Sequence, residues 1–194
     1  MNQTVNITPI DNVDNWAWAN VFTPEECTEI IDIGNRAVLT KATILKPEDR
    51  AIDLSVRDSD ISWLWPESGN DWIFEKIAGA TNYLNENYFN FHLSGFAEGM
   101  QFTRYVAPTG HYERHIDKAF KGQIRKLSLT IQLSSPEDYE GGGLMLFYDQ
   151  HTLVMPKEQG RMIAFPSYVL HQVSPVTTGT RYSLVAWLTG DPFK

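Results

Sequence analysis

The stretch Leu127-Ser128-Leu129-Thr130-Ile131-Gln132-Leu133 alternates apolar and polar side chains over its whole length. Successive side chains of a β-strand point to opposite faces, so this spacing predicts a strand with one apolar face. Three further runs of strand length follow it at 144–148, 162–165 and 182–188, and residues such as Gly141, Pro156 and Pro175 separate them. Short strands with turn residues between them are typical of an antiparallel sandwich or jelly roll.

Two helices are expected before these strands. Thr23-Pro24-Glu25-Glu26 combines an N-cap hydroxyl, a proline at the first helical position and a glutamate three residues after the cap. This pattern predicts a helix over about 24–38. Apolar residues at helical spacing predict a second helix over about 70–87, which Asn70 or Asp71 can cap.

Helices followed by closely spaced strands predict an α+β fold. We expect one domain over 1–194, with a helical N-terminal portion at about 20–87 and a double-stranded β-helix (jelly roll) core at about 88–190. The N-terminal helices would pack on one sheet of that core. Residues before about 20 are expected to form an arm or a first strand, and 40–70 shows few periodic elements.

Composition narrows the classes of partner. A net charge of −8 disfavours a protein that grips phosphate backbones, because such proteins need a basic surface. The one local basic run is interpreted as a solvated loop: Lys118, Lys121, Arg125 and Lys126. Cys27 is the only cysteine, so no intrachain disulfide can form and a metal site must use histidine and carboxylate ligands.

The expected localisation depends on whether the sequence contains a membrane span or a signal peptide. No apolar run approaches the roughly 20 residues of a membrane span. The N-terminus also lacks the charged and apolar regions of a signal peptide. We therefore expect no membrane partner and a cytoplasmic protein, in the host cytoplasm if the source is viral, and the oligomeric state stays open.

The candidate chemistry begins at His115-Ile116-Asp117. In an extended segment the histidine and the carboxylate share one face, so both can point at one ion. His171 lies 54 residues later and can supply a third ligand from a distant strand. Two imidazoles and one carboxylate form the facial triad of non-haem Fe(II) oxygenases, although zinc can use the same residue types.

Arg181 separates these two possibilities. It starts the alternating run that ends at Leu188, and its guanidinium can bind a carboxylate with two parallel hydrogen bonds. Ser183 shares its face and can add one more hydrogen bond. A buried arginine without a protein acid is costly, and a dicarboxylate cosubstrate would remove that cost.

The residues around these candidates resemble the 2-oxoglutarate oxygenases of the prolyl 4-hydroxylase superfamily, and the bacterial and viral PKHD-type branch is the most similar. The resemblance covers about 95–190 and weakens before it. The matching stretches are Gln101-Phe102-Thr103-Arg104-Tyr105, Tyr112-Glu113-Arg114-His115-Ile116-Asp117, Gly142-Gly143 with Leu144 and Leu146, and His171 to Pro175 followed by Arg181-Tyr182-Ser183 and Trp187. Weaker echoes are Val56-Arg57-Asp58-Ser59 and Trp63-Leu64.

The resemblance implies a role for each matching residue. His115, Asp117 and His171 would bind iron, and Arg181 would pair with the distal carboxylate of 2-oxoglutarate. The other expected cosubstrate contacts are Tyr105, Ser183 and Trp187. Where relatives carry a tyrosine on the strand after the His-x-Asp loop, this chain has Gln132 or Thr130. Substrate contacts are expected from Tyr112, Arg57 and Trp63.

The resemblance also implies an activity. Fe(II), 2-oxoglutarate and O₂ would be used, with ascorbate as a stimulant, and decarboxylation to succinate and CO₂ would drive C–H hydroxylation. A prolyl residue in a peptide or protein is the expected acceptor, and a small molecule or free amino acid is the alternative. AlkB-type nucleic-acid demethylases typically carry a second arginine six residues after the first, and here that position is Trp187.

Two alternative functions outside the oxygenase class stay open at this point. A non-enzymatic jelly-roll binding module would have no use for Arg181, and a zinc hydrolase would need a general base, for which Glu113 is the nearby candidate. The acidic loop at 134–140 is expected to be a plain hairpin connection rather than a lid. The segment at 40–70 is expected to shape substrate access.

Overall fold

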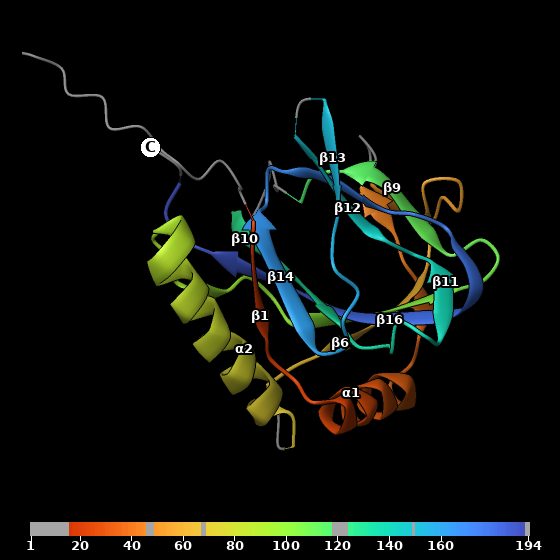
Figure 1. Ribbon diagram of the computed structural model, residues 1–194, viewed down its shortest axis with the longest axis horizontal. Coiled ribbons are helices and arrows are strands. Elements are labelled where there is room, and N and C mark those ends of the chain that lie inside the picture. The colour runs from red at the N-terminus through yellow and green to blue at the C-terminus, as the bar shows by residue number, and fades with distance from the viewer. Residues whose placement is uncertain (1–15, 46–48, 67–68, 118–123, 149, 193–194) are drawn as a thin grey trace, which may run out of the picture.

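The computed structural model describes residues 16–45, 49–66, 69–117, 124–148 and 150–192 (Figure 1). Two antiparallel sheets make up most of it. The larger sheet contains, in spatial order, β1 (Ala17–Asn20), β14 (Arg161–Pro166), β10 (Arg125–Gln132), β16 (Val176–Thr189), β8 (Met100–Val106), β6 (Asp60–Leu64) and β2 (Thr40–Lys41), with β11 (Tyr139–Gly141) and β7 (Gly95–Phe96) also paired to β16. The smaller sheet contains β13 (His151–Val154), β12 (Leu144–Tyr148), β15 (Leu170–Val173), β9 (His111–His115) and β5 (Arg57–Asp58), and β3 (Ile44–Leu45) pairs separately with β4 (Arg50–Ala51). This arrangement fits the expected jelly roll.

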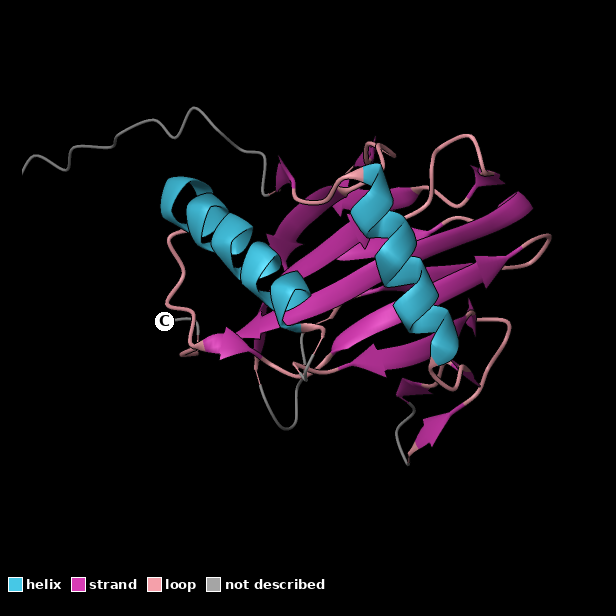
Figure 2. Cartoon of the chain, turned by 90° about the horizontal axis from the view of Figure 1, so that it is seen from below, coloured by secondary structure: helices cyan, strands magenta, loops and turns pink. Residues whose placement is uncertain are grey.

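Two helices lie across the same face of the larger sheet (Figure 2). The first helix, α1 (Pro24–Arg36), begins with the expected capping box: the Thr23 hydroxyl accepts from the Glu26 N–H, and a Glu26 carboxylate oxygen accepts from the Thr23 N–H. The second, α2 (Asp71–Leu84), follows Asn70, whose side chain makes no capping hydrogen bond. The expected side-chain cap is therefore wrong, and the chain continues after α2 as a π-helical turn, η1 (Asn85–Phe89).

The alternating run at 127–133 separates two environments. Its leucine and isoleucine side chains are fully buried in a core that also contains Ile30 of α1 and Ile77 of α2. On the opposite face, Ser128 and Gln132 are also buried, although polar residues that alternate with apolar ones usually face water. The polar face of β10 therefore points into the space between the two sheets, where a second apolar core contains residues such as Phe165 and Leu146.

The N-terminal portion is less helical than expected. Between α1 and α2 the chain forms five short strands, of which β2 and β6 extend the larger sheet and β5 extends the smaller one. Four of the five contain two residues, and an alternating pattern cannot show over so few positions. This portion therefore contributes to both sheets.

Two further expectations need correction. The prediction that the basic run forms a solvated loop is wrong for Lys126, which is 4% exposed, and for Arg125, which forms an ion pair with Glu98. The other two residues of the run, Lys118 and Lys121, lie outside the described residues. The 134–140 segment is not a plain hairpin connection, because β11 pairs with β16 and not with β10. In both cases pairing within the sheets outweighs the polar composition of the local sequence.

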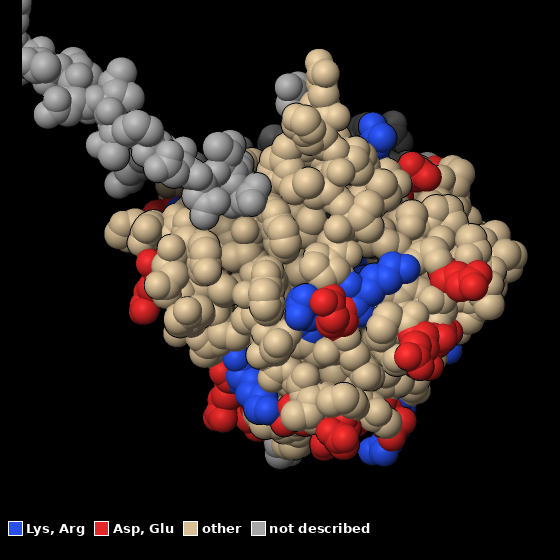
Figure 3. Space-filling view, in the orientation of Figure 1, with Lys and Arg blue, Asp and Glu red and all other residues tan. Residues whose placement is uncertain are grey.

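Charges of both signs lie on the face of the molecule that Figure 3 shows. On the face shown in Figure 3, lysine and arginine side chains lie in small groups beside acidic ones, and no continuous basic stripe crosses it. None of the helices within the described residues is both long and apolar enough to span a membrane.

Candidate metal site and its pocket

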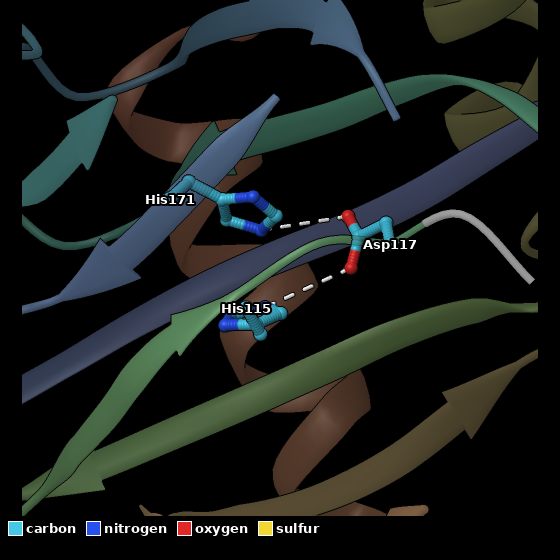
Figure 4. Close-up of side chains that lie close together, drawn as sticks. All are labelled: His115, Asp117 and His171. Atoms are coloured by element: carbon cyan, nitrogen blue, oxygen red, sulfur yellow. Dashed lines mark ion pairs between the residues drawn. The ribbon is translucent and has the colours of Figure 1, made fainter. Parts of the chain in front are cut away.

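Three potential metal ligands meet where β9 and β15 lie side by side. His115 and His171 are direct neighbours in the register of these strands, and their ring centroids are 4.1 Å apart. Asp117 follows β9 and is held by its own N–H, which donates to the Ser167 carbonyl at 2.9 Å. Its carboxylate oxygens lie 3.7 Å from Nε2 of His115 and 3.5 Å from Nε2 of His171 (Figure 4).

Hydrogen bonds orient both imidazoles. Nδ1 of His115 lies 2.7 Å from the Glu113 carbonyl oxygen, and Nδ1 of His171 lies 2.9 Å from that of Val169. A carbonyl oxygen can only accept, so we assign the proton of each ring to Nδ1. In each ring Nε2 is then the nitrogen that faces Asp117 and is left for a metal ion.

The protonation states also suit a cation. Burial, and then the neighbouring His171, lower the pKa of His115 to about 3, so this ring is neutral at pH 7. Burial alone would raise the pKa of Asp117, but both histidines and the hydrogen bonds from Trp187 and Ser128 outweigh it and hold the pKa below its ordinary value. The candidate ligand atoms of the triad all lie within 4.8 Å of one another. Two imidazoles and one carboxylate in this arrangement fit a divalent first-row transition metal.

The triad opens into a cavity of about 770 Å³ between the sheets. Alternate residues of β16 line it, as do residues of β8 and β10. The expected cosubstrate contacts that line this cavity are Tyr105, Thr130, Arg181, Ser183 and Trp187. Gln132 does not line it; it lies in a small adjoining cavity and instead binds Arg181.

Arg181 is among the largest fully buried side chains of the described residues. It is 2% exposed, its Nε donates to Oε1 of Gln132 at 3.1 Å, and its Nη1 lies 3.5 Å from Oγ of Ser183. Both acceptors are neutral, and no carboxylate among the described residues pairs with it. A guanidinium has five N–H donors, so several are left for a ligand. The arginine therefore fits one carboxylate of a dicarboxylate such as 2-oxoglutarate.

The expected substrate residues occupy another wall of the cavity. Arg57 is 7% exposed, and it donates to Oγ of Ser59 at 3.0 Å and to Oε1 of Gln101 at 2.7 Å. Its guanidinium lies 4.4 Å from the ring centroid of Tyr112, which in turn stacks on His115 at 3.5 Å.

Trp63 is more exposed than Arg57 or Tyr112 and faces the Trp187 ring at 6.4 Å. These three residues lie close enough to the triad to meet an acceptor.

Glu113 does not reach the triad. Its side chain is 57% exposed, it does not line the cavity, and its carboxylate lies 3.9 Å from His111. The zinc-hydrolase hypothesis therefore lacks the general base that Glu113 was expected to supply.

Several site residues escaped the sequence analysis. Ser128 donates to Oδ2 of Asp117 at 2.8 Å, and Arg125 stacks on Trp187 at 3.7 Å. Ser128 could have been found, because it shares the polar face of the 127–133 run with Thr130. Nothing in the local sequence marks the Glu98–Arg125 ion pair, whose partners are 27 residues apart.

Comparisons with known proteins agree with this geometry. Residues 100–189 match the model of the 2OG-Fe(II) oxygenase superfamily. A PKHD-type hydroxylase of Crocosphaera subtropica is 31% identical over 179 residues, which is 87% of this chain and 75% of the relative. A second PKHD-type hydroxylase, from Prochlorococcus marinus, is 38% identical, but the match covers only 51% of this chain and 45% of that relative.

Solved structures show the same fold. A Pseudomonas putida prolyl-4-hydroxylase superposes with a TM-score of 0.73 at 21% identity, covering 93% of this chain and 95% of that one. A Trichoplax adhaerens prolyl hydroxylase in complex with a hypoxia inducible factor peptide fragment superposes with a TM-score of 0.75 at 16% identity, covering 92% and 84%.

Proposed function

Because this chain belongs to the 2OG-Fe(II) oxygenase superfamily and is similar over most of its length to a PKHD-type hydroxylase, we propose that it is an iron-dependent hydroxylase of prolyl residues in a peptide or protein. His115, Asp117 and His171 would hold Fe(II), and Arg181 would hold 2-oxoglutarate. When bound, the metal and cosubstrate supply the oxidising chemistry: 2-oxoglutarate is decarboxylated to succinate and CO₂ as O₂ is consumed and a C–H bond is hydroxylated.

The observation that carries this proposal is that the triad shares its cavity with a buried arginine that has only neutral partners among the described residues. A structural metal needs no carboxylate-binding site beside it, and a zinc hydrolase needs a base that Glu113 does not supply. Arg181 opens into the same cavity as the triad and lacks an acidic partner among the described residues. A cosubstrate with a carboxylate at its far end would satisfy both features.

The protein's own groups then have distinct tasks. Arg181, with Ser183 beside it, would orient the cosubstrate through its distal carboxylate. Tyr105 lies with its ring 5.4 Å from the Arg181 guanidinium and would border the same ligand. The neutral imidazole of His115 and the ionised carboxylate of Asp117 would bind the ion without needing to lose a proton at pH 7.

The prolyl acceptor rests on the similarity to prolyl hydroxylases and on the wall formed by Arg57, Tyr112 and Trp63. Aromatic rings present flat apolar faces that suit a pyrrolidine ring, and Arg57 has donors for a peptide carbonyl or a carboxylate. A free amino acid or other small molecule is the second candidate, because a carboxylate would also meet the charge of Arg57.

The acceptor can be identified by mass spectrometry. A panel of proline-containing peptides, free amino acids and nucleosides is incubated with the protein, Fe(II), 2-oxoglutarate and ascorbate. We expect a gain of one oxygen on proline within a peptide, and no product with Arg57→Gln at matched enzyme concentration. Hydroxylation of a free amino acid alone would replace the peptide acceptor with the small-molecule one, and a product on a nucleobase would reject both.

A further inference from the structure

We propose that Trp187 and Ser128 are positioning residues that restrict Asp117 to a single metal-binding oxygen. The inference rests on the proposed function, because it takes Asp117 as an iron ligand. It gives Trp187 a task different from the expected cosubstrate contact. It also assigns a task to Ser128, which the family resemblance did not mark.

Both residues act on the same atom. Nε1 of Trp187 donates to Oδ2 of Asp117 at 2.8 Å, and Oγ of Ser128 donates to Oδ2 at the same distance. Oδ1 receives no hydrogen bond from the described residues and lies 3.7 Å from Nε2 of His115. Two donors occupy the lone pairs of Oδ2, so Oδ1 is the oxygen left for an ion.

The sheet places the two donors together. Ser128 of β10 and Trp187 of β16 are direct neighbours in the antiparallel register, so their side chains leave the sheet side by side on its inner face. Both are buried, at 0% and 6% exposure. A β-ladder fixes such a pair more firmly than a loop would.

Each donor also has its own support. Oγ of Ser128 lies 2.9 Å from Oγ of Ser167, a fully buried residue whose carbonyl accepts the Asp117 N–H. The backbone and the side chain of Asp117 are therefore tied to the same pair of serines.

Trp187 is covered on one face by the guanidinium of Arg125, 3.7 Å from the ring, and Glu98 pairs with that guanidinium. The cation draws electron density from the indole and strengthens its N–H as a donor to the carboxylate.

The arrangement has a consequence for coordination. A carboxylate with two free oxygens can bind a metal through both and occupy two positions. The facial triad is useful because three positions stay open for cosubstrate and O₂. With Oδ2 engaged by Trp187 and Ser128, Asp117 would take one position and leave those three.

Metal binding tests the proposal independently of turnover. Co(II) titrations of the metal-free protein, followed by absorbance and by competition with a chelator, give both the Kd and the coordination-sensitive spectrum. For Trp187→Phe combined with Ser128→Ala we expect a Kd about 10–100-fold higher and an altered Co(II) spectrum. Each single variant should weaken binding by about 3–10-fold, half of that range on a logarithmic scale, and these variants decide the matter if the double variant does not fold.

Matched controls come from the same chain. Ser62 is a buried serine that donates to the Gly34 carbonyl, and Trp72 packs edge-to-face on Phe22; Ser62→Ala and Trp72→Phe should leave the Co(II) Kd within twofold. A folded double variant with the wild-type Kd and spectrum would overturn the positioning role, provided that Asp117→Ala abolishes binding. If Asp117→Ala itself binds Co(II) like the wild type, the proposed iron site fails instead.

Discussion

Replacement of Arg181 by methionine should separate cosubstrate binding from the stability of the fold. Methionine has a similar length but no charge and no N–H donors. The guanidinium is 2% exposed and contacts the neutral acceptors Gln132 and Ser183. The wild-type protein without ligand therefore holds a buried charge that no acid within the described parts of the chain compensates, and the variant does not.

The expected magnitudes differ for the two properties. Truncating one partner of a buried, hydrogen-bonded charge pair costs about 2–5 kcal/mol, which at about 1.4 kcal/mol per tenfold raises the Kd for 2-oxoglutarate roughly 30- to several-thousand-fold. For the ligand-free fold, removal of an uncompensated buried charge is favourable, while loss of the donor to Gln132 costs about 1–3 kcal/mol. These effects oppose each other, so the unfolding free energy should stay within about 2 kcal/mol of the wild type.

The assay is urea denaturation of the Zn(II)-loaded protein with and without 2-oxoglutarate, combined with calorimetric titration of the ligand. At a ligand concentration of 100 times Kd the wild type should gain about 2.7 kcal/mol, and Arg181→Met should gain almost none. Arg104 is the matched control, since it lies on β8 and has an acidic partner, Asp60, at 3.0 Å. Arg104→Met should bind 2-oxoglutarate normally. The reasoning is refuted if Arg181→Met binds 2-oxoglutarate within twofold of the wild type, or if its ligand-free fold loses 3–5 kcal/mol.

Three smaller perturbations have equally definite outcomes. In Gly142→Ala the new Cβ would lie 3.0 Å from Cδ of Arg181 at a φ of +56°. We therefore expect about 1–2 kcal/mol lower stability by urea denaturation and weaker 2-oxoglutarate binding by calorimetry. Unchanged binding would show that the position of Arg181 does not depend on the space that Gly142 leaves. Because folding lowers the pKa of His115 from 6.5 to about 3, the unfolded chain binds the extra proton, and the metal-free protein should lose up to about 1.4 kcal/mol of stability per pH unit as the pH falls through that window. His115→Gln should flatten this slope over pH 4.5–6.5, and an equal slope in both proteins would contradict the assignment. Thr23→Ala removes one half of the capping box and should cost about 1 kcal/mol in thermal or urea unfolding while leaving the Kd for 2-oxoglutarate unchanged; a change in that Kd would show that α1 bears on the site.

Much of the core could be predicted from the sequence because its signals are local. The alternation at 127–133 and the capping box at Thr23 each depend on a few adjacent residues, and both appear in the structure as β10 and α1. The two-residue strands between α1 and α2 could not be predicted, because they are too short to show a period and are defined by their pairing partners; β5, for example, pairs with β9, and β2 pairs with β6. Long-range pairing of this kind leaves no mark on the local sequence.

The site residues likewise fall into those that the local sequence marks and those that depend on long-range pairing. His115, Asp117, His171 and Arg181 stand in a recognisable spacing, and the structure brings the triad together beside the arginine. Their supporting contacts depend on the register between β10 and β16, which the sequence does not reveal. For that reason the hydrogen bond from Trp187 to Asp117 could not be predicted from the sequence.

The central claim is that the triad and Arg181 form one site for Fe(II) and 2-oxoglutarate. The most direct test is succinate formation from 2-oxoglutarate, followed by nuclear magnetic resonance without added acceptor, in the wild type, Asp117→Ala and Arg181→Met. We predict slow succinate formation by the wild type with Fe(II), none with Zn(II), and none by Asp117→Ala. Arg181→Met should regain turnover only at much higher 2-oxoglutarate. Equal turnover by Asp117→Ala and the wild type, or equal turnover with Zn(II) and Fe(II), would contradict the account.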